Sequence, residues 1–255
     1  MLATILVIAL LIAVHEFGHF LAARRCGAGV DVFSIGFGPP IFSHKFRGTI
    51  YQIAAIPLGG YVKLRGFQDG KEDDPNGFYS LSKIRQGIIF AAGPVANLIF
   101  ALVIAILMFW LHTGFSFQEA ARGGTETTIK MIGLNLSAIS DLVKGKCMEN
   151  LSGPVGIIKA GKEMQQSFGF FGLVNLAFGL SISLGVLNLL PVPLLDGGHL
   201  TILGLEAIMR RKLTMRQREM FSLIGFMLLM GIFIFATSQD LSKIFSGTPF
   251  IQKTP

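Results

Sequence analysis

Two histidines and a glutamate inside an apolar stretch are the residues whose types and spacing point most directly to chemistry. The stretch VHEFGHFLA places His15 and His19 four residues apart, so on a helix their imidazoles lie on one face. Neutral imidazoles at this spacing can bind one Zn²⁺, and the adjacent Glu16 can serve as a general base. Ionisable side chains are costly inside a membrane and usually functional there. The pattern therefore predicts a metal site rather than two core histidines and a buried glutamate.

A catalytic zinc site normally has a third protein ligand. The best candidate is Asp196 in the stretch NLLPVPLLDGGHL, which directly follows an apolar segment and would lie at the membrane depth of His15 and His19. Two alternatives remain open. His199, three residues further on, is a rival ligand, and an aspartate before two glycines is also a common turn residue.

The composition excludes a soluble globular protein. Of 255 residues, 51% are hydrophobic and only 15% are charged, and the mean hydropathy is +0.61, whereas soluble domains carry about 25% charged residues. The formal net charge is +7, and basic residues of membrane proteins collect in cytoplasmic loops. No nucleic-acid-binding pattern accompanies this charge. We expect an integral membrane protein whose surroundings are membrane lipid, with no nucleic-acid partner.

The predicted fold class is an all-α polytopic membrane protein with about four transmembrane helices. Each helix must cross a hydrocarbon core of about 30 Å, and the apolar segments long enough to do so are residues 2–23, 87–111, 168–190 and 220–236. Residues 30–64 alternate apolar residues with Gly and Pro, which is typical of short strands and turns. They predict a membrane-associated β-region after the first helix. The basic residues of the first and third loops place these loops in the cytoplasm and both termini outside.

Four motifs, in this order along the chain, resemble the site-2 protease family, and most closely its bacterial branch typified by the regulator-of-sigma-E protease. They are HEFGH at 15–19, GPVAN at 93–97, SGPVG at 152–156 and NLLPVPLLDGG at 188–198. The resemblance implies an intramembrane metalloendopeptidase with Zn²⁺ as its cofactor. It also implies that His15, His19 and Asp196 are the metal ligands and that Glu16 is the catalytic base.

The same resemblance implies a substrate class and a location. Asn188 and Pro191 match the family's Asn-Pro-Asp pattern and are expected to bind substrate. The expected substrates are single-pass transmembrane proteins of the anti-sigma-factor or signal-peptide-remnant type, cleaved in regulated intramembrane proteolysis. The expected location is the bacterial inner membrane, with the active site towards the cytoplasmic side.

One departure from the branch concerns its PDZ domains, of which one or two usually lie between the second and third helices. Only about 56 residues separate Leu111 from Phe168, too few for a fold of roughly 90 residues. We therefore expect a single metalloprotease domain over residues 1–255, without a PDZ domain. A catalytically silent zinc-binding membrane scaffold and a transporter remain as alternatives. The intact Glu16 argues against the scaffold, and the lack of an evident inverted repeat argues against the transporter.

Overall fold

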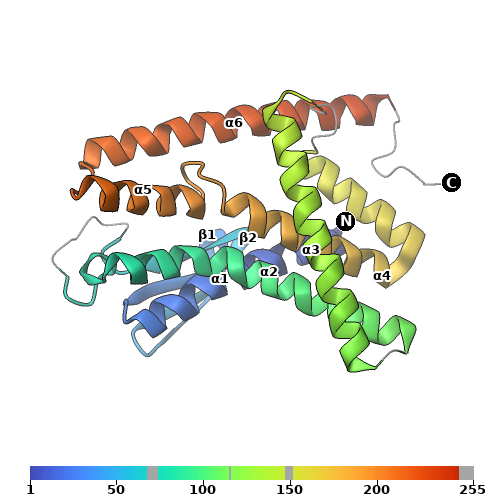
Figure 1. Ribbon diagram of the computed structural model, residues 1–255, viewed down its shortest axis with the longest axis horizontal. Helices are drawn as coiled ribbons and strands as arrows, with labels where there is room; N and C mark the ends of the chain where they lie inside the picture. The colour runs from blue at the N-terminus through green and yellow to red at the C-terminus, as the bar shows by residue number, and fades with distance from the viewer. Residues whose placement is uncertain (68–73, 115, 147–151, 247–255) are drawn as a thin grey trace.

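The structure is a computed structural model that describes residues 1–67, 74–114, 116–146 and 152–246, without the side chains of residues 57, 58, 112, 113 and 215. One helix precedes a two-stranded sheet, and the described elements after the sheet are helical (Figure 1). The elements are α1 (Leu2–Cys26), β1 (Val30–Phe46), β2 (Thr49–Leu64), the 3-10 turn η1 (Phe78–Ser80), α2 (Lys83–Thr113), α3 (Phe117–Val143), α4 (Pro154–Asn188), α5 (Asp196–Met209) and α6 (Met215–Phe245).

Four of the helices, α1, α2, α4 and α6, are long and apolar enough to cross a membrane. This confirms the predicted fold class. In Figure 1, α2 and α6 both run from left to right, and α1 runs in the opposite direction. The described parts of the chain also contain α3 and α5, neither of which the hydropathy pattern predicted. Both lack the long uncharged run that marks a membrane-spanning segment.

Helix α4 is bent sharply at Gly169, whose φ of 60° and ψ of −138° are not helical. The predicted segment 168–190 corresponds to the limb after this bend. The limb before it starts at Pro154 and was missed because Lys159, Lys162 and Glu163 interrupt its apolar residues. The two limbs pack closely, since a Cβ added at Gly172 would lie less than 3.0 Å from the Met164 carbonyl.

Helix α3 runs across the long axis of the molecule (Figure 1). Its first turn is stabilised by a capping box, in which Ser116 and Glu119 each bond the other's backbone N–H. Gly124 lets it approach the backbone of Ile106 on α2, and Ser183 on α4 donates a hydrogen bond of 2.8 Å to Asn135. Helix α3 thus occupies the connection in which the family branch carries PDZ domains. Residues 147–151 lie outside the described ranges, and the single-domain expectation stays a prediction.

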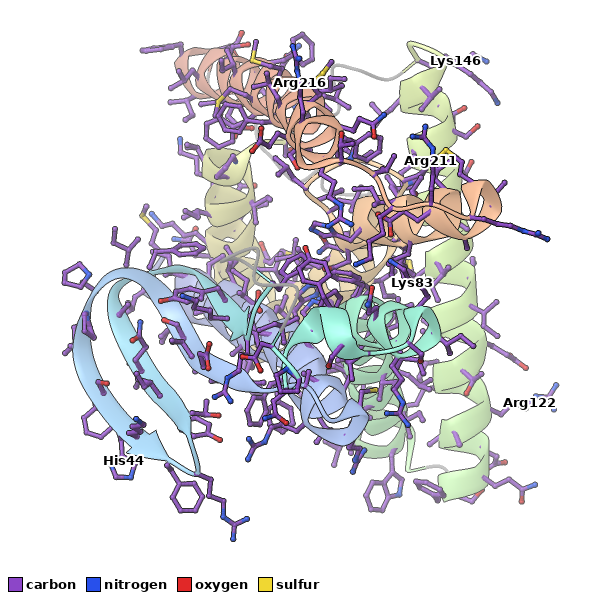
Figure 2. All side chains as sticks on the ribbon, turned by 90° about the vertical axis from the view of Figure 1, so that its left-hand side faces the viewer. His44, Lys83, Arg122, Lys146, Arg211 and Arg216 are labelled. Carbon is purple, nitrogen blue, oxygen red and sulfur yellow. The ribbon has the colours of Figure 1, made fainter. Side chains whose placement is uncertain are left out.

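Strands β1 and β2 form an antiparallel pair within the residues predicted as a β-region, 30–64. Different parts of β1 pair with the same part of β2, so that Gln52 of β2 lies opposite both Ser34 and Ser43 of β1. The end of the sheet near α1 is buried in a core with Ala23 and Ile89. The far end exposes large apolar side chains, among them Ile41 and Phe42, and carries His44 near its tip (Figure 2). One end of the sheet therefore belongs to the core between the helices, and the other end, which includes Ile41 and Phe42, forms an exposed apolar arm.

Helix α6 is held by carboxylates at both of its ends. Near its start, Arg218 donates a hydrogen bond of 2.7 Å to Glu206 of α5. Near its end, Asp240 is fully buried and accepts hydrogen bonds from the backbone N–H groups of Gly153 and Gly156, at 3.1 and 2.6 Å. Asp240 therefore caps the N-terminus of α4, where a negative charge is favourable.

Glu206 joins three helices through one buried carboxylate. It accepts hydrogen bonds from Lys83 at the start of α2, from Arg218 and from the backbone N–H of Leu213; Lys83 is labelled in Figure 2. Burial by itself would raise the pKa of the Glu206 carboxyl, but the hydrogen bonds from Lys83, Leu213 and Arg218 outweigh burial and lower it below its usual 4.5.

This lowered pKa predicts a pH-dependent contribution to stability. A carboxyl group whose pKa is lower in the folded than in the unfolded protein stabilises the fold above its unfolded-state pKa, here 4.5. This contribution is lost as the pH falls towards the lower folded-state value. We expect Glu206→Gln to unfold at a lower temperature than the wild type at neutral pH. The difference should shrink as the pH is lowered through 4.5, measured by thermal unfolding in detergent. A difference that is independent of pH would contradict this assignment.

Candidate metal centre

The structure brings His15, His19 and Asp196 together, although Asp196 is far from the histidines in the sequence. His15 and His19 lie on one face of α1, and Asp196 is the first residue of α5. The Nε2 atom of His15 lies 3.0 Å from Oδ2 of Asp196, and that of His19 lies 3.3 Å from Oδ1. The two Nε2 atoms are 3.2 Å apart.

These distances fit a tetrahedral metal ion. Four ligand atoms about 2.0–2.1 Å from a zinc ion lie roughly 3.3 Å from one another. The proton positions agree with this fit. The Nδ1 atom of His19 is 2.7 Å from the Ile89 carbonyl oxygen, which can only accept a hydrogen bond, so Nδ1 carries the proton. In the neutral ring, Nε2 then directs its lone pair into the cluster, where a bound cation would balance the lone pair and the carboxylate.

Helix α2 leaves space in front of the two imidazoles because Gly93 has no side chain. A Cβ added at Gly93 would lie less than 3.0 Å from Nε2 of both His15 and His19. Helices α1 and α2 also meet closely at the adjacent residues, where a Cβ at Gly18 would collide with the Ala92 carbonyl. The bare backbone at Gly93 therefore provides the volume in which a metal ion can be held.

Asp196 is placed by the break between α4 and α5. The N-terminus of α5 packs against the preceding turn so tightly that a Cβ at Gly197 or Gly198 would collide with the Leu190 or Val192 carbonyl, respectively. The two glycines therefore serve this close contact. Burial by itself would raise the pKa of Asp196, but the adjacent imidazoles of His15 and His19 lower the pKa to about 2. The carboxyl group is thus ionised, as a metal ligand must be.

A cavity of about 380 Å³ opens onto the three ligand candidates. Its lining includes Glu16, Asn188 and residues 59–62 of β2. The Glu16 carboxylate accepts a hydrogen bond from the backbone N–H of Val62, so the sheet orients this side chain. Pro191 is not among the described residues that line the cavity; it lies in the exposed turn between α4 and α5.

His199, the rival ligand, lines the same cavity but is held by aromatic neighbours. Its ring stacks on Phe90 with the ring centres 4.6 Å apart, and it meets Phe67 edge to face. Within the described part of the chain, the group that could hold a metal ion comprises His15, His19 and Asp196 without His199.

Two contacts to the imidazoles were not predicted from the sequence. One is the hydrogen bond between His19 and the Ile89 carbonyl, and no side-chain pattern can indicate a backbone acceptor. The other joins Asn97 and His15, whose Nδ2 and Nδ1 atoms are 3.3 Å apart. Asn97 ends the GPVAN motif, so a sequence signal for it was present, but the motif by itself does not show which side chain it contacts.

The space at Gly93 leads to a prediction about metal binding. We expect Gly93→Ala to weaken the binding of Zn²⁺ by more than about tenfold, since its methyl group displaces both imidazoles from their positions. Competition with a chromophoric chelator on the purified protein measures this affinity. Gly179→Ala is the matched control, because a Cβ there meets open space. Equal affinities of the two variants would show that Gly93 does not border the metal.

Comparisons with known proteins agree with this geometry. Residues 3–232 match the model of Peptidase family M50. A Campylobacter jejuni protein is 30% identical over 95% of this chain and 93% of its own length, and an Agrobacterium fabrum protein is 28% identical over 94% and 95%, respectively. Both are named as candidate zinc metalloproteases. The first alignment covers 343 positions, more than the 255 residues here, so that relative contains segments which this chain lacks. The chain belongs to peptidase family M50, as its resemblance to the site-2 proteases predicted.

Proposed function

We propose that this protein is a zinc-dependent endopeptidase that hydrolyses peptide bonds inside the membrane. The observation that carries the proposal is the convergence of His15, His19 and Asp196 in one cavity, beside Glu16. The described part of the chain also contains four candidate membrane spans, one of which carries the two histidines and Glu16. Membership of a peptidase family supports the reaction class, and the names of the relatives support the metal.

His15, His19 and Asp196 are the residues that would hold the zinc ion. Two imidazole nitrogens and a carboxylate oxygen form a ligand set of the kind found at catalytic zinc sites, which leave a fourth position open. When bound, the ion supplies Lewis acidity to a water molecule and to the scissile carbonyl.

Glu16 is the proposed general base. Its carboxylate lines the same cavity as the ligand candidates, and the Val62 N–H holds it from the side of the sheet. Glu16 accepts a proton from the attacking water and returns it to the leaving amine. Because this hydrogen bond comes from β2, the position of the base depends on the docking of the sheet against α1.

The proposed substrates are single-pass transmembrane proteins of the anti-sigma-factor or signal-peptide-remnant type. A helical substrate hides its carbonyl groups in its own hydrogen bonds, so it must unwind locally before hydrolysis. The cavity is lined by Gly59 and Gly60, which lack side chains that would fill it, and by Asn188. We assign to the Asn188 amide the role of holding the backbone of the unwound segment.

We further propose that the protein lies in a bacterial inner membrane with both termini outside. Basic residues support this orientation, because they are concentrated in residues 24–86 and 210–218, which include the adjoining helix ends. Lys83, Arg211 and Arg216, labelled in Figure 2, belong to these two stretches. Asp196 follows α4, and α5 leads from it to the second of these stretches, so the active site is assigned to the cytoplasmic side.

Glu16→Gln tests the proposed mechanism. This variant keeps both histidines and removes the base, so cleavage of a tagged single-pass substrate is expected to fall by at least about 100-fold while bound zinc stays stoichiometric. Glu126→Gln, an exposed position on α3, is the control for the same change of charge. Equal cleavage by the wild type and Glu16→Gln would refute the mechanism. A wild type that binds zinc but cleaves no member of a panel of single-pass substrates would favour the catalytically silent scaffold.

Asn188→Ala tests substrate binding separately from metal binding. Loss of a single hydrogen bond to the substrate is worth about 1 kcal/mol, so kcat/KM is expected to fall by roughly five- to tenfold. The zinc affinity should not change, because Asn188 lines the cavity without belonging to the metal-binding group. Kinetics and chelator competition on the same preparation measure both quantities. A variant that loses zinc, or one that keeps full kcat/KM, would contradict this role.

A further inference from the structure

We propose that Asn97 is a positioning residue for the metal: its amide oxygen accepts a hydrogen bond from Nδ1–H of His15 and so leaves Nε2 of that ring free to bind the ion. The inference rests on the proposed metal site and deepens it. It concerns a residue of α2, a helix that supplies none of the three ligand candidates.

Asn97 is fully buried, with 0% of its surface exposed. Its Nδ2 atom lies 3.3 Å from Nδ1 of His15, while its Oδ1 atom is buried without a hydrogen-bond partner among the described residues. The backbone carbonyl of Asn97 accepts a hydrogen bond of 2.8 Å from Ser181 on α4. The residue is therefore anchored, and one end of its side chain still lacks the partner that a buried polar atom requires.

The orientation of the Asn97 amide decides which nitrogen of His15 carries the proton. If the NH₂ group faces the ring, Nδ1 must accept, and the proton of the neutral ring lies on Nε2, which then cannot bind a metal. If the oxygen faces the ring, Nδ1 carries the proton and Nε2 offers its lone pair. A half-turn of the amide exchanges these two arrangements. The same half-turn gives the oxygen a donor and moves the NH₂ group to the place that the oxygen leaves, so the requirement that Nε2 bind the ion decides between the two arrangements.

His19, in contrast, has a backbone carbonyl as its partner, which can only accept a hydrogen bond. Its Nδ1 faces the Ile89 carbonyl at 2.7 Å, so its tautomer is already the one that binds a metal. Both outer contacts come from α2, with Ile89 before Gly93 and Asn97 after it. One helix thus orients both imidazoles and, through Gly93, leaves the space in front of them. The GPVAN motif acquires a physical explanation for its first and last residues.

A pair of variants with the shape of asparagine tests the direction of this hydrogen bond. Asn97→Leu removes both donor and acceptor, and Asn97→Asp keeps acceptors only. Gln86→Leu is the matched control, because Gln86 is a buried amide on the same helix that bonds the Phe78 and Leu81 carbonyls, away from the imidazoles. The readouts are Zn²⁺ affinity by chelator competition, the absorption spectrum of the Co²⁺-substituted protein, and the thermal unfolding midpoint of the metal-free protein.

We expect Asn97→Leu to bind Zn²⁺ about 10–100-fold more weakly than the wild type, the usual cost of removing an outer partner of a metal-binding histidine. Asn97→Asp should stay within about threefold of the wild type, and its Co²⁺ spectrum should be unchanged. Gln86→Leu should lower the unfolding midpoint without changing the affinity.

Three results would overturn the inference. They are wild-type affinity in Asn97→Leu, a loss in Asn97→Asp as large as that in Asn97→Leu, and an equal loss in Gln86→Leu. If Asn97→Leu does not fold, Asn97→Asp decides by itself, because a donor role for Asn97 predicts weak binding there. A wild type that binds no Zn²⁺ would refute the proposed function itself. A wild type that binds Zn²⁺, together with any of the three results above, would refute only the role of Asn97.

Discussion

The close approach of α1 and α2 is the contact on which the rest of the site depends. A Cβ at Gly18 would collide with the Ala92 carbonyl, and one at Gly93 would collide with both imidazoles. In a membrane, helices associate closely through such small residues, because apolar side chains gain little by leaving lipid. Backbone-to-backbone contact brings Ile89 and Asn97 within hydrogen-bonding distance of the histidines. It also leaves room between the helices for an ion.

The site needs a second constraint, because His15 and His19 on α1 do not complete it. Asp196 reaches them only because α4 ends in a tight turn and α5 starts against it. An ionised carboxylate at this depth is costly unless it is paired. Here its oxygens lie 3.0 and 3.3 Å from the two imidazoles, where a bound cation would balance its charge. Its position in the first turn of α5 is also favourable for a negative charge. Glu206 at the other end of α5 binds Arg218 of α6, so the helix that carries Asp196 is held at both ends.

The parts of the site are oriented by different elements. Helix α2 contacts the outer sides of both imidazoles, whereas β2 contacts Glu16 through the Val62 N–H. The orientation of the proposed ligands and that of the proposed base therefore depend on different elements. A change in α2 is expected to act on metal affinity, and a change in the sheet on the proton transfer. The exposed apolar arm of β1 and β2 continues from the same sheet.

Sequence patterns determined what depends on local geometry. The spacing of His15 and His19 brings them to one face of any helix, and long apolar runs reveal four membrane spans. The first limb of α4 was not predicted because polar residues interrupt it, and α3 and α5 were not predicted because they lack a long apolar run. The proposal of Asp196 rather than His199 as the third ligand rests on the tertiary structure. Both residues lie near the start of α5, and the turn after α4 decides which of them faces α1. The same holds for Asn97, because its contact with His15 joins residues 82 positions apart, and only the packing of α1 against α2 brings them together.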